Sequence, residues 1–172
     1  MNMDIITPKE NNLQYSQGTF EDLSQDIENS GDELNLTRDY VYTTSDPSSV
    51  GILKSITING NGHTIDGNNA SIIHIFSDNV TLKNLKLVNF KERWLGGFIT
   101  WKGDNGIFSN CSGNSNSIWL EYSKNFNVSD CNFTNNVYNM TSIQIHDCEQ
   151  CVITNRNFEY IVSYQKFIPN EL

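Results

Sequence analysis

The sequence predicts an all-β fold, a right-handed parallel β-helix of about five coils that begins with a short capping helix. A short phrase of alternating apolar and polar residues around an Asn, Asp or Gly recurs along the chain, aligned at Ile58, Leu82, Phe108, Val128 and Ile153. The spacings are 24, 26, 20 and 25 residues, which are typical of a solenoid repeat. Hydrophobic residues make up 37% of the chain, which suits the narrow interior of a solenoid.

The first elements are a polar lead-in and a helix. Residues 1–17 are polar and are expected to be a flexible lead-in, followed by one β-helix domain over 18–172. Thr19 and Asp22 have the spacing of a capping box, with Asp in place of Glu. The apolar residues that follow share one helical face: Phe20, Leu23 and Ile27. A helix over 18–31 is therefore expected to cover the open end of the solenoid.

Strands and turns account for the rest of the chain. Residues 32–50 are expected to hold a first strand and a turn-rich loop, and 51–160 the coils. Besides the recurring phrase, each coil carries a second apolar segment with residues two apart, as in a half-buried strand: 73–75, 98–100, 118–120 and 143–145. Residues 161–172 are expected to form a C-terminal cap or tail.

The recurring phrase requires a bend. Inward residues of a straight strand have one residue between them, but Leu82 and Leu85, which both point inward, have two. The bend falls at Asn84, Asn110, Asp130 and Asn155, with Gly60 in the first copy. Asn tolerates the left-handed region and its amide can bond to the next coil, so this ladder is expected to be structural. Arg156 replaces an apolar residue and predicts an open or distorted last coil.

The composition excludes some functions. The net charge is -9, and the 11 basic residues are scattered, so nucleic-acid binding is not expected. Membrane insertion is not expected either, since no segment approaches the ~18 apolar residues of a span.

The four cysteines form two pairs. Cys111 and Cys131 occupy one inward position and are expected to stack as buried free thiols. Cys148 and Cys151 form a Cys-x-x-Cys, which could be a local disulfide or two free thiols. Without a second such pair, a zinc site is not expected, and no other metal or cofactor is predicted.

The candidate binding site lies on the outside of the coils. Trp101, Glu121 and His146 follow successive apolar segments and are expected to share one outward position, with Trp119 and Tyr122 beside them. An aromatic ring, a carboxylate and an imidazole could bind a sugar. The alternative is ordinary variation on an outer face. His63 could pair with Asp66 in acid–base or metal chemistry, or could serve only as a turn residue.

One stretch carries a family resemblance. Residues 54–67, Lys-Ser-Ile-Thr-Ile-Asn-Gly-Asn-Gly-His-Thr-Ile-Asp-Gly, resemble the opening coil of adhesin-like surface proteins of methanogenic archaea, which are pectin-lyase-like β-helices. The cap helix, Asp39-Tyr40 and residues 79–84 are similar as well. The resemblance extends over 19–90 and weakens to the general coil pattern over 106–160.

The resemblance implies a non-catalytic module at the cell surface or outside the cell, for cell adhesion and carbohydrate binding. Its expected partners are host or microbial cell-surface glycans or proteins, and the chain would belong to a longer surface protein. No catalytic residue is implied. One alternative is a fragment of a polysaccharide lyase or glycoside hydrolase of the pectin-lyase-like superfamily. Such lyases use a calcium-binding carboxylate cluster with an Arg or Lys that abstracts a proton, and such hydrolases use paired carboxylates. The other alternative is a purely structural spacer, which shares the fold but binds no ligand.

Overall fold

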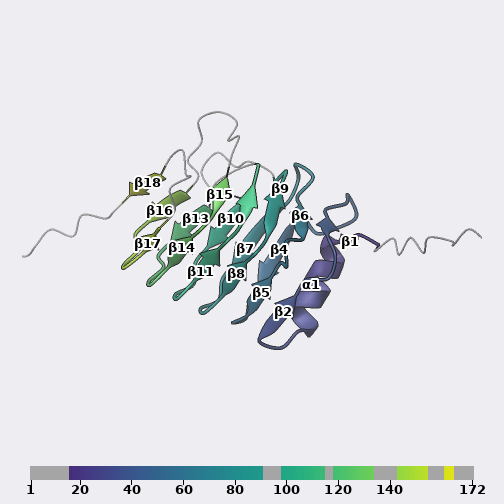
Figure 1. The fold of residues 1–172 in the computed structure, drawn as a ribbon, viewed down its shortest axis with the longest axis horizontal. Helices are drawn as coiled ribbons and strands as arrows, with labels where there is room; N and C mark the ends of the chain where they lie inside the picture. The colour runs from purple at the N-terminus through teal and green to yellow at the C-terminus, as the bar shows by residue number, and fades with distance from the viewer. Residues whose placement is uncertain (1–15, 91–97, 115–117, 134–142, 155–160, 165–172) are drawn as a thin grey trace, which may run out of the picture.

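A computed structural model describes residues 16–90, 98–114, 118–133, 143–154 and 161–164. It confirms the predicted fold class: parallel strands stack into a β-solenoid of about five turns with one short helix near the N-terminus (Figure 1). Among the described residues, no helix is long and apolar enough to span a bilayer.

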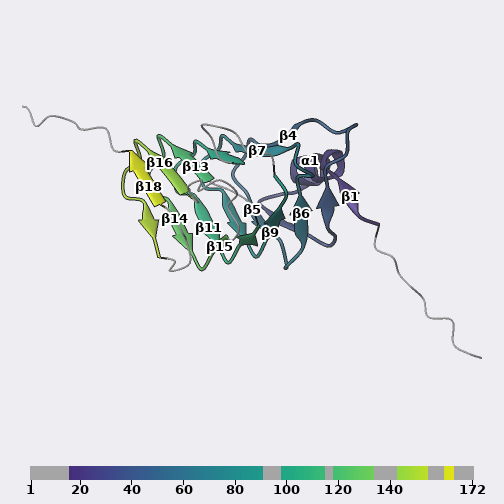
Figure 2. The same ribbon diagram turned by 90° about the horizontal axis from the view of Figure 1, so that it is seen from above.

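Three six-stranded parallel sheets form the walls of the solenoid (Figure 2). Sheet A contains β1 (Gly18–Thr19), β3 (Tyr40–Val41), β6 (Thr64–Asp66), β9 (Lys86–Val88), β12 (Ser112–Gly113) and β15 (Asn132–Phe133). Sheet B contains β2 (Glu33–Asn35), β5 (Thr57–Asn59), β8 (Thr81–Lys83), β11 (Ile107–Ser109), β14 (Asn127–Ser129) and β17 (Val152–Ile153). Sheet C contains β4 (Ser49–Ile52), β7 (Ile72–Ile75), β10 (Ile99–Trp101), β13 (Ile118–Glu121), β16 (Ile143–His146) and β18 (Ile161–Tyr164). The chain visits the sheets in the order B, A, C in each coil.

The repeat alignment read from the sequence is confirmed on sheet B. Its five reference positions are consecutive partners across the sheet, and Leu34 extends the row by one coil: Leu34, Ile58, Leu82, Phe108, Val128 and Ile153. Side chains alternate between the two faces of a strand, so this row points inward along its whole length. The first coil begins at Glu33, earlier than the expected start at residue 51, because β2, β3 and β4 already pair with the strands of the next coil.

Helix α1 (Phe20–Asn29) covers the N-terminal end of the stack, as predicted (Figure 1). Thr19 and Asp22 form the expected capping box, with reciprocal bonds of 2.8 and 3.1 Å. The buried residues of the helix are Phe20, Leu23 and Ile27. On its outer side Asp26 accepts a 2.6 Å bond from the Tyr40 hydroxyl, which ties the helix to sheet A.

The core holds a line of aromatic rings that links the coils. Phe90 stacks on Phe98 with ring centroids 4.6 Å apart, and Phe98 lies 6.4 Å from Phe133. Phe133 stacks on Phe108 at 5.8 Å, and all four rings are at most 2% exposed. Apolar burial of this kind is the main favourable term for each added coil.

The corners between sheets carry asparagine ladders. At the corner from sheet B to sheet A, Asn84 and Asn110 have the predicted left-handed backbone, with φ of 57° and 48°, as does Asp130 at 54°. The Asn110 Nδ2 donates to Asn84 Oδ1 at 2.7 Å, and Asn84 Nδ2 donates to Asn59 Oδ1 at 2.8 Å. Asn84 and Asn110 thus form the ladder that the sequence predicted. Asn155 and Arg156 lie outside the described residues.

The first copy of the bend differs from the prediction. Gly60 was expected to adopt the left-handed backbone of the bend, but the left-handed residues there are Asn61 and Gly62. This corner is two residues longer than the same corner in the next coil, and Asn61 and Gly62 are the extra residues. Gly60 is needed for another reason: a side chain on it would meet the backbone oxygen of Asn84, 2.5 Å away.

Two further ladders occupy the other corners. At the corner from sheet C to sheet B, Asn125 donates to Asn105 and Asn105 to Asn79, each at 3.1 Å. At the corner from sheet A to sheet C, Asn114 donates to Asn89 at 3.1 Å, and Asn89 donates to the Asp66 carboxylate. Of the tail, Ile161–Tyr164 form β18, which pairs with β16 and extends sheet C by one strand.

Candidate functional site

The outward position proposed for Trp101 is wrong. Trp101 pairs with Leu120 across sheet C and is 0% exposed, with its ring edge-on to Phe126 at a centroid distance of 4.7 Å. The sequence alignment placed Phe98 opposite Ile118, whereas the strand register places Ile99 there. A slip of one residue moves every side chain of a strand to the other face, so Trp101 turns into the core.

Lys102 takes the outward place expected for Trp101. Its Nζ lies 2.7 Å from the Glu121 Oε2 on the next coil. Glu121 in turn pairs with His146 across β13 and β16, as predicted. The three successive coils therefore present a lysine, a carboxylate and an imidazole in one row.

The remaining predicted site residues do lie together. The Trp119 ring stacks over the His146 ring at 6.5 Å, and the Tyr122 ring meets His146 edge-on at 6.0 Å. Tyr122 is 61% exposed and has a φ of 55°, an uncommon conformation for an aromatic residue. Trp119, Glu121, Tyr122 and His146 thus form one cluster on the outward side of sheet C.

The same face continues toward the helical end of the solenoid. His74 is in register with Thr100, and Thr100 with Trp119, so they share one outward row. The His74 and Phe76 rings stack at 5.6 Å, and Phe76 is 51% exposed. We call the residues Phe76, Lys102, Trp119, Glu121, Tyr122 and His146 the sheet C face. Phe76 and Lys102 were not predicted from the sequence, although they are 26 residues apart, which is one of the spacings of the repeat itself.

The sheet C face suits a ligand with both apolar and hydroxyl surfaces. Aromatic rings offer flat apolar area, while Glu121, Lys102 and His146 supply hydrogen-bond acceptors and donors. Strands stack about 4.8 Å apart, so the face is a nearly flat strip with one row of side chains per coil. The pair of Lys102 and Glu121 is partly exposed, and its attraction is correspondingly weak.

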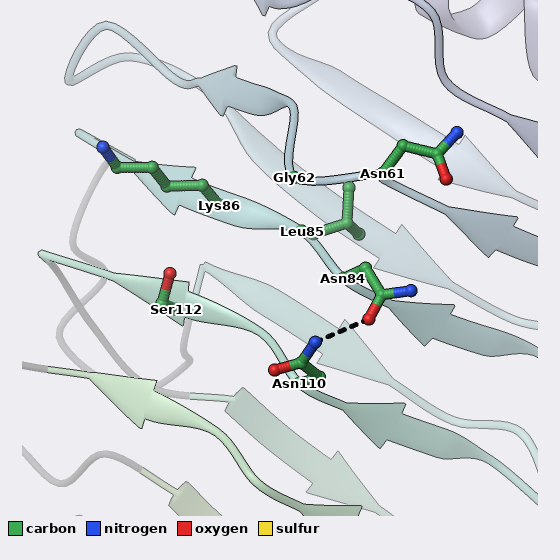
Figure 3. Close-up of a pocket in the computed structure, with 7 residues that line it drawn as sticks. All are labelled: Asn61, Gly62, Asn84, Leu85, Lys86, Asn110 and Ser112. Carbon is green, nitrogen blue, oxygen red and sulfur yellow. Dashed lines mark hydrogen bonds between the residues drawn. The ribbon is translucent and has the colours of Figure 1, made fainter.

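A shallow depression of about 450 Å³ lies elsewhere, at the corner from sheet B to sheet A. Figure 3 shows that the two extra residues Asn61 and Gly62 lie beside Leu85 of the next coil, with Asn110 and Ser112 on the coil after that. Its lining is Asn61, Gly62, Asn84, Leu85, Lys86, Asn110 and Ser112. The amides of Asn84 and Asn110 are engaged in the ladder, so the depression offers few free polar groups.

His63 does not pair with Asp66. Its Nδ1 lies 3.0 Å from the Asp39 Oδ1 of the preceding coil, and the Thr64 amide donates to the same oxygen at 2.8 Å. The Thr64 bond holds the pKa of Asp39 below its usual value, and the His63 contact adds to the effect. The Asp66 carboxylate accepts instead from Asn68 and Asn89. His63 thus fits its expected role as a turn residue. Among the described residues, no three His, Cys, Asp or Glu side chains lie close enough together to hold a metal ion.

The cysteines are free thiols. Cys111 and Cys131 stack on adjacent coils and are 1% and 0% exposed, as predicted, and burial is the main reason that the pKa of Cys111 is raised. Cys148 and Cys151 are half-buried at the corner from sheet C to sheet B. A hydrogen bond with Cys151 lowers the pKa of Cys148 to about 7.

The fold and the sheet C face define a class, a parallel β-solenoid with an aromatic and charged strip along one sheet. No family model, curated protein or solved structure matches the chain significantly.

Proposed function

We propose that this chain is a non-catalytic binding module of the cell surface, which attaches to polysaccharides or cell-surface glycans through the sheet C face. The observation that carries the proposal is the cluster of Trp119, Tyr122 and His146 rings beside the Glu121 carboxylate. Sugars present apolar C–H faces and hydroxyl edges, which aromatic rings and carboxylates respectively bind.

Polar side chains at the corners of the solenoid already have a role within the stack itself. The corner asparagines are engaged in ladders between coils, so their side chains stabilise the stack. The extracellular setting and the role in adhesion come from the resemblance of residues 54–67 to adhesin-like proteins. A rigid stack that holds side chains at fixed intervals also limits the entropy lost when a repetitive ligand binds.

A glycan array probed with the purified chain tests the proposal. We expect binding to a set of related glycans, and loss of that binding in Trp119→Ala. The matched control is Ile107→Ala, because Ile107 is also a partly exposed apolar residue, 42% accessible, but lies on sheet B. Binding that survives Trp119→Ala would contradict the assignment to sheet C, and silence on the array would favour a structural spacer.

A polysaccharide-cleaving enzyme is the second candidate, favoured by the row of Lys102, Glu121 and His146. These groups could act in general acid–base catalysis if a sugar chain lay across them. Turnover assays on pectate and related polymers distinguish the two functions. Product formation that is lost in Glu121→Gln would establish an enzyme, whereas binding without turnover supports the module.

A further inference from the structure

The corner between β16 and β17 holds two thiols where the preceding coil holds a buried serine and a buried phenylalanine. Ser123 and Phe126 occupy the equivalent positions one coil earlier and are 0% and 1% exposed. In the last described copy of this corner the same positions are Cys148 and Cys151, and both are half-buried. Both thiols are therefore partly accessible to solvent.

The turn that separates the two cysteines is fixed by the preceding coil. The Glu149 amide donates to Ser123 O, and the Asn125 amide donates to Glu149 O, both at 3.0 Å. The Glu149 carboxylate lies 3.1 Å from Lys124 Nζ. Gln150 has the left-handed backbone of this corner, with a φ of 55°. Across this turn the Cys148 thiol donates to His146 O at 3.5 Å, and the Cys151 thiol donates to Ser123 O of the preceding coil at 4.0 Å.

The two thiols differ in chemistry. Their shared hydrogen bond lowers the pKa of Cys148 to about 7 and raises that of Cys151. Backbone groups of Ser123 and His146 stabilise the Cys148 thiolate as well, while burial and Asp147 oppose it. A thiol whose pKa is near the ambient pH is the best attacking group in thiol–disulfide exchange. In many redox-active pairs the start of a helix stabilises the thiolate. Here the strand β17 follows Cys151, so the neighbouring thiol and backbone groups stabilise the Cys148 thiolate instead.

We propose that Cys148 and Cys151 form a redox-active dithiol that exchanges with small-molecule disulfides. The Cys148 thiolate attacks one sulfur of the disulfide RSSR, which forms a mixed disulfide and releases RS⁻. The Cys151 thiol loses its proton and attacks the Cys148 sulfur, which forms the Cys148–Cys151 bond and releases the second RS⁻. The dithiol loses two electrons and two protons, and RSSR gains them to become two RSH.

Cys111 and Cys131 provide an internal comparison. They also hydrogen-bond to each other, but they are at most 1% exposed in the core. An incoming disulfide cannot reach them without unfolding of the coil, so the proposal predicts reaction at one pair and not at the other.

Oxidised glutathione tests the proposal on the reduced full chain at pH 7. After an acid quench and alkylation, tandem mass spectrometry should find a Cys148–Cys151 disulfide, with Cys111 and Cys131 alkylated. Cleavage after Glu149 separates the two cysteines, so the disulfide joins two peptides. Cys151→Ser should instead accumulate one glutathione on Cys148. Cys148→Ser should react about three- to fourfold more slowly, because an ordinary thiol is only a few per cent ionised at this pH, and the greater nucleophilicity of its thiolate offsets only part of that difference.

Two results would overturn the proposal, and neither needs a variant. One is modification of Cys148 no faster than that of Cys111. The other is a glutathione adduct that persists on the wild-type chain without closing to the Cys148–Cys151 disulfide. Circular dichroism of each variant verifies that the comparison is made between folded proteins.

Discussion

The asparagine ladder gives the sharpest test of how the solenoid is held together, through substitution of Asn84. Its side chain makes two ladder bonds, one to Asn59 at 2.8 Å and one from Asn110 at 2.7 Å. Each hydrogen bond of this kind contributes about 0.5–1.5 kcal/mol net, so the two contribute about 1–3 kcal/mol. The left-handed backbone of Asn84, with φ 57°, adds a conformational cost of about 1–2 kcal/mol for a residue such as alanine.

Two substitutions separate these contributions. Asn84→Ala should lower the free energy of unfolding by about 2–5 kcal/mol, because it loses both bonds and strains the backbone. Asn84→Gly also loses both ladder bonds, but glycine adopts the left-handed backbone without strain. It should be destabilised by about 1–3 kcal/mol and remain more stable than the alanine variant.

Urea unfolding followed by circular dichroism measures both differences. Asn127→Ala is the matched control, since Asn127 is exposed on β14 and its backbone is extended; its stability should stay within about 0.5 kcal/mol of wild type. If Asn84→Gly were as stable as wild type, the ladder bonds would contribute nothing and Asn84 would serve only the backbone bend.

Three further predictions concern the core, a coil corner and acid stability. Phe108→Ala should lower the free energy of unfolding in urea by about 3–5 kcal/mol, because the ring is fully buried; a loss below 1 kcal/mol would contradict the packing. Gly103→Ala should prevent folding or cost more than about 2 kcal/mol, since its methyl group would collide with the Ser77 backbone oxygen; wild-type circular dichroism and stability would refute this. Asp39 has a pKa lowered by the Thr64 amide, so its stabilisation is present above its ordinary value of 3.8 and is lost as the pH falls through the folded pKa. Asp39→Asn should therefore be less stable than wild type at pH 7 and approach it at pH 2 in urea titrations; a pH-independent difference would count against the assignment.

Much of the fold could be predicted because each coil repeats the same physical requirements. The inward row through Leu82, Phe108 and Val128 follows from apolar alternation and a regular spacing. The ladder of Asn79, Asn105 and Asn125 was missed, although its spacings of 26 and 20 residues match those of the recurring phrase. Its asparagines precede the phrase, at a corner for which the sequence pattern indicated no bend.

The candidate site could be predicted less well, for a physical reason. Four of its five residues lie on the sheet C face, but Trp101 lies in the core. Phe98, Ile99 and Trp101 are all buried, so strict alternation does not fix the register of this strand from sequence. The pairing of Ile99 with Ile118 resolves it, and that pairing depends on the length of the whole coil. Lys102 was missed for the same reason.

Titration of the best glycan from the array into the chain tests directly whether the sheet C face is the binding surface. Calorimetry with wild type, Trp119→Ala and Ile107→Ala would give three dissociation constants. Trp119→Ala should weaken binding about fivefold or more, if a sugar stacked on the ring contributes the ~1–3 kcal/mol that a nucleic-acid base contributes on an aromatic side chain. Ile107→Ala should bind as wild type does. Equal affinity of all three chains would show that the glycan does not bind at Trp119 on the sheet C face.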